Sequence, residues 1–257
     1  MSDPAPVATA VDHEPVAATS RLLRGLRAFG WTLVWSGVLV LGFVAHQLWV
    51  TTWLAQLNQG DLDSQRQARF EIAVITEVPY VASSTPPPGD PGGPGTTPDP
   101  GPTPTLLVES PPEEHASFAL IRIPKIERLR DGWNVVEGVS RADLKNGAGH
   151  MPRTPLPGQP GNAVISGHRT TYGAPFHELD ILEPGDRVEV DTALGTHVYE
   201  VREVIVVAPT DVWVTEPRPG AWLTLTTCHP KFSARQRLVV FAELVAGPNA
   251  PVILGAS

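Results

Sequence analysis

The only cysteine of the 257-residue chain, Cys228, ends an apolar run that begins at Ala221, and His229 and Pro230 follow it directly. A single cysteine cannot form a disulfide within the chain. Its thiolate is a strong nucleophile when a base or a positive charge stands nearby. Cys228 is therefore the first candidate for a catalytic nucleophile. The alternative is that it fills the core as a small apolar side chain.

Arg237 begins the next apolar run, and only the short loop 229–236 separates it from Cys228. A loop of this length can return the chain antiparallel, which brings Arg237 close to Cys228. A guanidinium placed there can stabilise a thiolate or a developing oxyanion through its N–H donors. The alternative is an ordinary surface ion pair.

A cysteine nucleophile also needs a proton donor for the leaving amine, and histidine is the usual supplier. Of the 8 histidines, His168 closes a strand-like run that starts at Asn162 and stops at Gly167. A rigid strand that ends there would hold the imidazole at a rim. His168 is the first choice, and His229 stays possible because it lies at the turn. Three others lie in less constrained surroundings: His150, His177 and His197.

The composition argues against other kinds of site. One cysteine cannot supply the paired thiolates of a structural zinc site. The stretch 209–220 offers only Asp211 and Glu216 as carboxylates for calcium. A formal net charge of −8, without a cluster of Lys and Arg, disfavours nucleic acid as a partner. We therefore expect no metal ion, no other cofactor and no nucleic acid.

From Phe118 onward, short apolar runs alternate with turn residues, a texture typical of an all-β domain. Strands this dense favour a barrel over a layered α/β sheet, so we expect a β-barrel within residues 113–257. Leu223 and Leu225 should face its core, while Cys228 faces outward. The expected strands are 118–123, 134–137, 162–166, 187–191, 197–207, 221–227 and 237–245, with brief helices near 141–145 and 175–182.

The chain before residue 113 divides into three parts. Residues 1–28 begin with a stretch rich in Ala, Pro and Thr, which predicts a disordered cytoplasmic tail. Residues 29–53 carry no formal charge and are long enough for a transmembrane helix, whereas a cleaved signal peptide would have a shorter apolar part. Arginines precede this span, so the positive-inside rule places the C-terminal domain outside the cell. Residues 54–112 contain Pro-Pro-Pro and Gly-Pro steps, which predict a juxtamembrane segment and an extended stalk.

Two motifs resemble those of a known family. The run Thr-Leu-Thr-Thr-Cys at 224–228 resembles the Thr-Leu-Xaa-Thr-Cys signature of sortases, and Ile165–Thr170 resembles the histidine motif of that family. Arg237 stands where sortases place their arginine, and the order His, Cys, Arg is also the family order. The Cys-His-Pro that ends the signature is most similar to class E sortases of Gram-positive bacteria.

This resemblance covers about residues 118–245 and implies a closed eight-stranded barrel with an active groove on its wall. It implies that Cys228 attacks the Thr carbonyl of a Leu-Ala-Xaa-Thr-Gly sorting signal to form a thioester, that His168 moves the protons, and that Arg237 steadies the oxyanion. The partners would be secreted proteins with such signals and the amine of a peptidoglycan precursor. Tyr172 and Thr227 would bind substrate. Alternatively, Tyr172 could simply pack on the rim of the barrel, and Thr227 could stand there because threonine favours β-strands.

Two other functions stay open. An L,D-transpeptidase-like wall enzyme also uses Cys and His, but its usual Ser-His-Gly-Cys context is absent. An inactive wall-associated binding protein would not need Cys228, His168 and Arg237 together. For a transpeptidase we expect a pH optimum modestly above neutrality, because a free thiol has a pKa of about 8.5 and a free imidazole one of about 6.5.

Overall fold

The computed structural model describes residues 16–46, 50–80 and 103–255, which form two compact units. The first unit holds helix α1 (Val16–Ala45), and its stretch Leu23–Ala45 is long and apolar enough to cross a bilayer. Large apolar side chains of this stretch, such as Leu39 and Leu41, are 74% and 71% exposed. A helix that is apolar and uncovered in this way is suited to lipid. The span expected at 29–53 differs, because α1 ends at Ala45 and residues 51–53 belong to the next helix.

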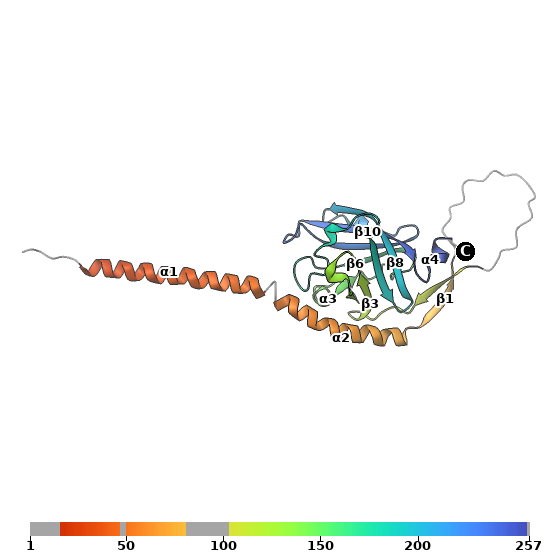
Figure 1. The fold of residues 1–257 in the computed structure, drawn as a ribbon, viewed down its shortest axis with the longest axis horizontal. Helices are drawn as coiled ribbons and strands as arrows, with labels where there is room; N and C mark the ends of the chain where they lie inside the picture. The colour runs from red at the N-terminus through yellow and green to blue at the C-terminus, as the bar shows by residue number, and fades with distance from the viewer. Residues whose placement is uncertain (1–15, 47–49, 81–102, 256–257) are drawn as a thin grey trace, which may run out of the picture. The chain divides into compact units, whose positions relative to one another are not determined.

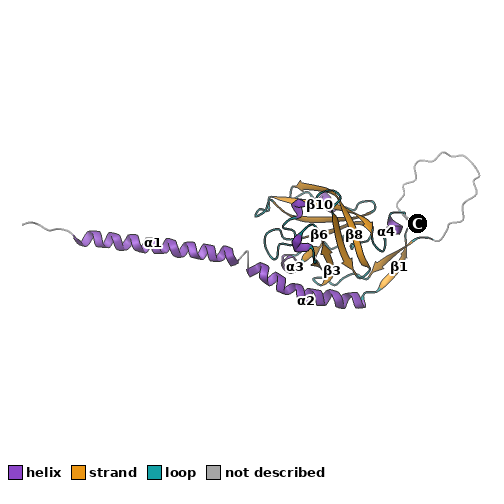
Figure 2. Ribbon diagram, in the orientation of Figure 1, coloured by secondary structure: helices purple, strands orange, loops and turns teal. Residues whose placement is uncertain are grey.

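The second unit is built around a closed eight-stranded β-barrel, which confirms the expected fold class (Figures 1 and 2). The strands follow the spatial order β10-β8-β7-β3-β4-β5-β6-β9. Neighbours are antiparallel except for the pairs β4–β5 and β6–β9, which are parallel. The bounds are β3 (Ser117–Arg122), β4 (Trp133–Glu137), β5 (Ala148–His150), β6 (Gly161–Ser166), β7 (Arg187–Thr192), β8 (Gly195–Val207), β9 (Ala221–His229) and β10 (Gln236–Ala246).

Short helical segments join these strands. The α-helical ones are α3 (Arg141–Asn146) and α4 (Ala250–Ile253), and the 3-10 turns are η2 (Glu127–Leu129), η3 (Leu179–Ile181) and η4 (Val212–Thr215). Helix α3 begins with a capping box, in which the Ser140 hydroxyl accepts from the Asp143 amide and the Asp143 carboxylate accepts from the Ser140 amide. The helix expected near 141–145 is therefore confirmed, whereas the segment 175–182 forms only the turn η3.

The core of the barrel follows the two-residue alternation of its strands. In β9, Leu223 and Leu225 are fully buried in the main apolar cluster, and Val240 and Ala242 of β10 join them. Each fully buried Leu contributes about 2 kcal/mol of transfer free energy. Because the inward faces are filled in this way, Cys228, which lies an odd number of residues from Leu225, stands on the outward face.

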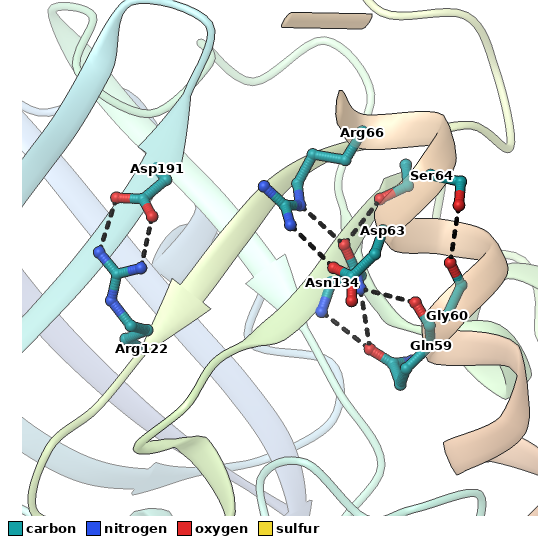
Figure 3. Close-up of polar contacts among 9 residues, drawn as sticks. Gln59, Gly60, Asp63, Ser64, Arg66, Arg122, Asn134 and Asp191 are labelled. Atoms are coloured by element: carbon teal, nitrogen blue, oxygen red, sulfur yellow. Dashed lines mark hydrogen bonds and ion pairs between the residues drawn. The ribbon is translucent and has the colours of Figure 1, made fainter. Parts of the chain in front are cut away.

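Helix α2 (Thr51–Ile72) and a two-stranded sheet, β1 (Ile75–Pro79) with β2 (Thr105–Glu109), belong to the same unit as the barrel. Asn134 of β4 is the hub that holds α2, as Figure 3 shows. Its side-chain NH₂ donates to Asp63 Oδ1 at 3.0 Å and to Gln59 Oε1 at 3.2 Å, and its Oδ1 accepts from Arg66 Nε at 3.0 Å. Asn134 is 1% exposed, so these contacts are shielded from water.

The domain boundary therefore differs from the one expected at residue 113. We expected residues 54–112 to be a juxtamembrane segment and a stalk, outside the catalytic domain, but α2, β1 and β2 belong to the same unit as the barrel, and Leu106 and Glu109 of β2 are buried. The physical reason is that polar contacts fix these elements, such as the bond from the Leu107 amide to Asn249 Oδ1 at 2.8 Å. The proline-rich residues 81–102 of the expected stalk lie outside the described residues.

Replacing Asn134 by alanine should release α2 from the barrel. The change removes several buried hydrogen bonds and leaves their partners unsatisfied. We therefore expect the free energy needed to separate α2 from the barrel to fall by about 2–4 kcal/mol. Hydrogen–deuterium exchange read by mass spectrometry would show faster exchange of the α2 amides. The matched control is Ser64→Ala, because the Ser64 hydroxyl donates to the Gly60 carbonyl within α2 and its loss should change little (Figure 3). Unchanged α2 protection in Asn134→Ala would count against this docking role.

Candidate active site

Three neighbouring strands carry the candidate catalytic residues. Strand β9 pairs with β10 on one side, and Cys228 and Arg237 are direct partners in that antiparallel register. On the other side β9 pairs with β6, with Ser166 opposite Thr226. The paired register ends there, and His168 lies two residues after Ser166, as Cys228 lies two residues after Thr226. Lateral partners face the same side of a sheet, and here the Ser166 and Thr226 hydroxyls lie 2.8 Å apart.

A groove runs along the outward face of these strands. It has a volume of about 200 Å³ and is lined by Ser166, Thr226, Val239 and Arg237, together with residues of the loop between β8 and β9 that includes η4. Ser166, Thr226 and Val239 form the row next to His168, Cys228 and Arg237. Cys228 itself is half-buried, so its thiol is neither sealed in the core nor fully exposed. A larger hollow of about 350 Å³ between α2 and residues 113–117 contains no Cys or His, so volume alone does not locate the chemistry.

His168 and Tyr172 lie against each other on the segment that follows β6. Their ring centroids are 5.0 Å apart, and Lys145 Nζ lies 5.5 Å from the Tyr172 centroid. Burial lowers the pKa of the half-buried His168, and the nearby positive charge of Lys145 lowers it further. Both effects disfavour the imidazolium form. Lys145 was not among the residues expected from the sequence, because α3 brings it to the site from outside both motifs.

The backbone after Tyr172 folds in an unusual way. Tyr172, Gly173 and Ala174 all have positive φ, at 52°, 76° and 44°. A Cβ at Gly173 would come within 2.4 Å of the Trp133 ring, so glycine is required there. Strain of this kind is held by the surrounding packing and often marks a functional segment. Here it sets the Tyr172 ring beside His168.

Thr227 is buried on the inward side of β9. It is 3% exposed, and its hydroxyl donates to the Gly167 carbonyl at 2.8 Å. The expected contact of Thr227 with substrate does not fit this placement, because alternation along the strand turns it away from the Cys228 face. Its bond instead braces β9 against the residue that precedes His168.

The side chain of Arg237 rests on its own loop. Its Nη1 donates to the Ala234 carbonyl at 3.1 Å and to the Gln236 carbonyl at 3.0 Å, while its backbone pairs with that of Cys228. The guanidinium thus starts beside the nucleophile but is held by carbonyls in this structure. A substrate carbonyl could replace these acceptors, because Ala234 and Gln236 are exposed.

The other histidines of the barrel have structural partners. His150 and His197 are 1% and 0% exposed, which removes them from the surface. His177 Nδ1 donates to the Arg169 carbonyl at 2.7 Å, and His229 Nδ1 lies 2.8 Å from Arg169 Nη1. Within the part of the chain that the structure describes, no group of three His, Cys, Asp or Glu side chains could hold a metal ion.

Comparison with known proteins finds relatives of this chain in one family. The sortase domain model matches residues 121–245. Sortase SrtE1 of Streptomyces coelicolor is 29% identical over 235 residues, which cover 85% of this chain and 57% of that protein. Sortase D of Bacillus subtilis is 32% identical over 139 residues, which cover 52% of this chain and 67% of that protein.

Among solved structures, the SrtF sortase from Corynebacterium diphtheriae aligns with a TM-score of 0.50 and 30% identity, covering 53% of this chain and 88% of that one. The chain thus spans less than two thirds of SrtE1, but most of the SrtF structure. With its barrel, its Thr-Leu-Thr-Thr-Cys strand and these relatives, the chain belongs to the sortase family of cysteine transpeptidases and resembles its class E members.

Proposed function

We propose that this chain cuts a C-terminal sorting signal of the Leu-Ala-Xaa-Thr-Gly type between Thr and Gly and joins the protein to an amine of a peptidoglycan precursor. The observation that supports this proposal is the register of β6, β9 and β10, in which Cys228 is the partner of Arg237, and Ser166, two residues before His168, is the partner of Thr226. The apolar wall of the groove, which includes Val207, Val212 and Val239, suits the Leu side chain of such a signal.

In the first half-reaction, the Cys228 thiolate attacks the carbonyl carbon of the signal threonine and forms a C–S bond. The carbonyl oxygen becomes an oxyanion, which the Arg237 guanidinium stabilises by hydrogen bonds. The His168 imidazolium gives its proton to the glycine nitrogen, and the C–N bond breaks. A threonyl thioester on Cys228 and neutral His168 remain, and the glycine fragment leaves as a free amine.

In the second half-reaction, an acceptor amine attacks the thioester carbonyl. His168 takes a proton from this amine, the new C–N bond forms, and the C–S bond breaks to restore the thiolate. One amide is exchanged for another, so the sequence of steps needs no oxidant, metal or cofactor. Two half-reactions through one acyl-enzyme give ping-pong kinetics.

Tyr172 is proposed to contact the substrate next to the scissile bond. Its ring lies 5.0 Å from that of His168, on a strained segment at the rim. An aromatic ring there can pack on the signal and screen His168 from water while the acyl-enzyme waits for its amine.

The proposed location is the cell membrane, with a single span in α1. Arg21, Arg24 and Arg27 precede most of the apolar stretch, so the positive-inside rule would keep the N-terminus in the cytoplasm and the barrel outside. The barrel would then meet its partners, secreted proteins with sorting signals and wall precursors, on the outer side of the membrane.

A fluorogenic peptide with the sequence Leu-Ala-Xaa-Thr-Gly tests this function on the full chain in mild detergent. Cleavage between Thr and Gly, with transfer to an added amine, is the expected result. A peptide in which Thr and Gly are exchanged serves as the control substrate. Binding without cleavage would instead favour an inactive binding protein, and cleavage of peptidoglycan stem peptides alone would favour an L,D-transpeptidase.

Replacing Lys145 by glutamine should move the acid limb of the pH profile of kcat/KM to higher pH. The positive charge of Lys145 disfavours the imidazolium and so lowers the pKa of His168, and its removal raises that pKa again. In wild type, the acid limb should therefore lie below the ordinary histidine value of about 6.5. The active form of the enzyme holds an imidazolium and a thiolate together. A higher pKa of His168 increases the fraction of molecules in this form, so we expect a modest gain in rate near neutral pH in the variant.

The matched control for Lys145→Gln is Lys125→Gln. Lys125 is bound to Glu183 and Asp186 and carries the same charge, but it does not act on the pKa of His168. Superimposable acid limbs in wild type and Lys145→Gln would show that Lys145 does not tune the histidine.

A further inference from the structure

Arg169 directly follows His168 in the chain, yet its side chain is 2% exposed. Such burial is rare for a guanidinium, because the charge must be compensated inside the protein. Its Nη2 lies 2.9 Å from Asp180 Oδ2, which supplies the counter-charge. Asp180 also lies 3.9 Å from Lys231 Nζ, on the loop between β9 and β10. The arginine thus ties together three loops at the candidate active site.

The other end of the guanidinium reaches the end of β9. Arg169 Nη1 donates to the Cys228 carbonyl at 3.3 Å and to His229 Nδ1 at 2.8 Å. Arginine has only donors, so the His229 nitrogen that faces it carries no proton. That nitrogen cannot serve as a proton donor to a leaving amine. His229, which the sequence left as a second candidate for that role, is therefore an acceptor in this contact.

The main chain of Arg169 is fixed as well. Its carbonyl accepts a hydrogen bond from His177 Nδ1 at 2.7 Å, and the carbonyl of His168 accepts one from the Phe176 amide at 3.1 Å. The segment that carries His168 is thus anchored on both its main chain and its neighbouring side chain. Cys228 and His229 are adjacent in strand β9, so their side chains face opposite sides, and the Arg169 guanidinium lies on the side of His229.

We propose that Arg169 is a positioning residue, which locks the Cys228 carbonyl and the His229 ring to the His168 segment and so sets the distance between thiol and imidazole. This inference rests on the proposed transpeptidase function and deepens it. The guanidinium of Arg169 contacts the Cys228 carbonyl, the His229 ring and Asp180. It acts through Cys228, because a guanidinium bonded to that residue's own carbonyl restricts how the end of β9 can move.

The test compares Arg169→Met, Arg169→Lys and Asp180→Asn in the full chain, with cleavage of the Leu-Ala-Xaa-Thr-Gly peptide as the first readout. A misplaced nucleophile lowers kcat, whereas the peptide still meets the same groove, so we expect kcat to fall about 10-fold to 100-fold in Arg169→Met with little change in KM. Asp180→Asn leaves the guanidinium without its counter-charge and should show a smaller fall of the same kind.

The second readout is alkylation of the only cysteine by iodoacetamide, followed by mass spectrometry across pH 6 to 9. It reports on Cys228 without any peptide, so it remains valid even if the wild-type chain cleaves no sorting signal. Lack of cleavage by wild type would contradict the proposed function. A changed pH profile of alkylation in Arg169→Met and Asp180→Asn would still support the positioning role.

His229 provides a rescue experiment. Asparagine can place its Oδ1 near the position of His229 Nδ1, so His229→Asn keeps an acceptor for Arg169, whereas His229→Leu removes it. We expect kcat of His229→Asn to stay within about threefold of wild type and that of His229→Leu to fall further. Loss of activity in both variants would instead make His229 a proton carrier.

The control for a general loss of stability is Arg122→Met. Arg122 makes a two-point contact with Asp191 (Figure 3), at 2.5 Å and 2.8 Å, between β3 and β7, neither of which pairs with β9. The Arg122→Met variant should have a lower melting temperature but the same kcat as wild type when folded. Arg169→Lys and Asp180→Asn remain informative even if Arg169→Met does not fold. If these two variants fold and match wild type in both kcat and the pH profile of alkylation, the positioning role is overturned.

Discussion

Cys228→Ala should abolish cleavage of a Leu-Ala-Xaa-Thr-Gly peptide, with a fall in kcat of at least about 10⁴-fold. The variant lacks the sulfur that must form the thioester, and no other cysteine exists to replace it. The fold should survive, because Cys228 is half-buried and its strand is held by backbone pairing with β6 and β10. The measurement is the steady-state rate of the fluorogenic peptide at saturating concentration.

The same variant should still bind the peptide. The groove beside Ser166, Thr226 and Val239 is unchanged, so the affinity measured by calorimetry should stay near that of wild type. Cys228→Ser is the closer control, because its hydroxyl fills the same space but is a much weaker nucleophile. Residual turnover of Cys228→Ala above a few per cent would assign the reaction to another group.

Arg237→Ala should lower kcat by about 10²-fold to 10³-fold, the effect of removing a principal donor to an oxyanion. Arg237 is the direct strand partner of Cys228, so its side chain starts next to that of the proposed nucleophile. Arg237→Lys keeps the charge but loses the planar fork of donors, and we expect it to recover only part of the rate.

Arg235→Ala is the matched control for Arg237→Ala. Arg235 lies in the same loop and is exposed, but it precedes the paired residues of β10. Its removal changes the local charge equally and should leave kcat within about twofold of wild type. Equal losses in the two variants would mean that the charge of the loop, rather than a positioned donor, supports the reaction.

Much of the barrel could be predicted from the sequence because short apolar runs alternate with turn residues from Phe118 onward. Leu223 and Leu225 mark the inner face of β9, and this fixes the outward direction of Cys228. The short loop to Arg237 then decides the pairing of β9 with β10. Strand β5 was not predicted, because Ala148, Gly149 and His150 have neither the length nor the β-branched composition of a strand.

The docking of α2 and the segment after Tyr172 were beyond prediction. Asn134 holds α2 through polar contacts, which leave no apolar periodicity to read. Most of the helix expected at 175–182 does not form. Phe176 is instead fully buried next to Gly167, and its amide donates a hydrogen bond to the His168 carbonyl. Tertiary contacts override local helix propensity in such a segment.

The supporting groups of the site share this difficulty. Lys145 reaches Tyr172 from α3, and Arg169 reaches Asp180 and His229 across loops that are far apart in the sequence. The motif around His168 draws attention to that residue alone. Only the folded chain shows that the next residue, Arg169, is buried and bonded to the carbonyl of Cys228.

Intact-mass analysis of the acyl-enzyme tests the central claim most directly. The full chain is incubated with the Leu-Ala-Xaa-Thr-Gly peptide without an acceptor amine and quenched in acid. We predict a mass increase equal to the fragment that ends at Thr, located on Cys228 by fragmentation, released by hydroxylamine and absent from Cys228→Ala. An equal adduct in Cys228→Ala, or cleavage by wild type with no adduct under any quench, would contradict a thioester at this cysteine.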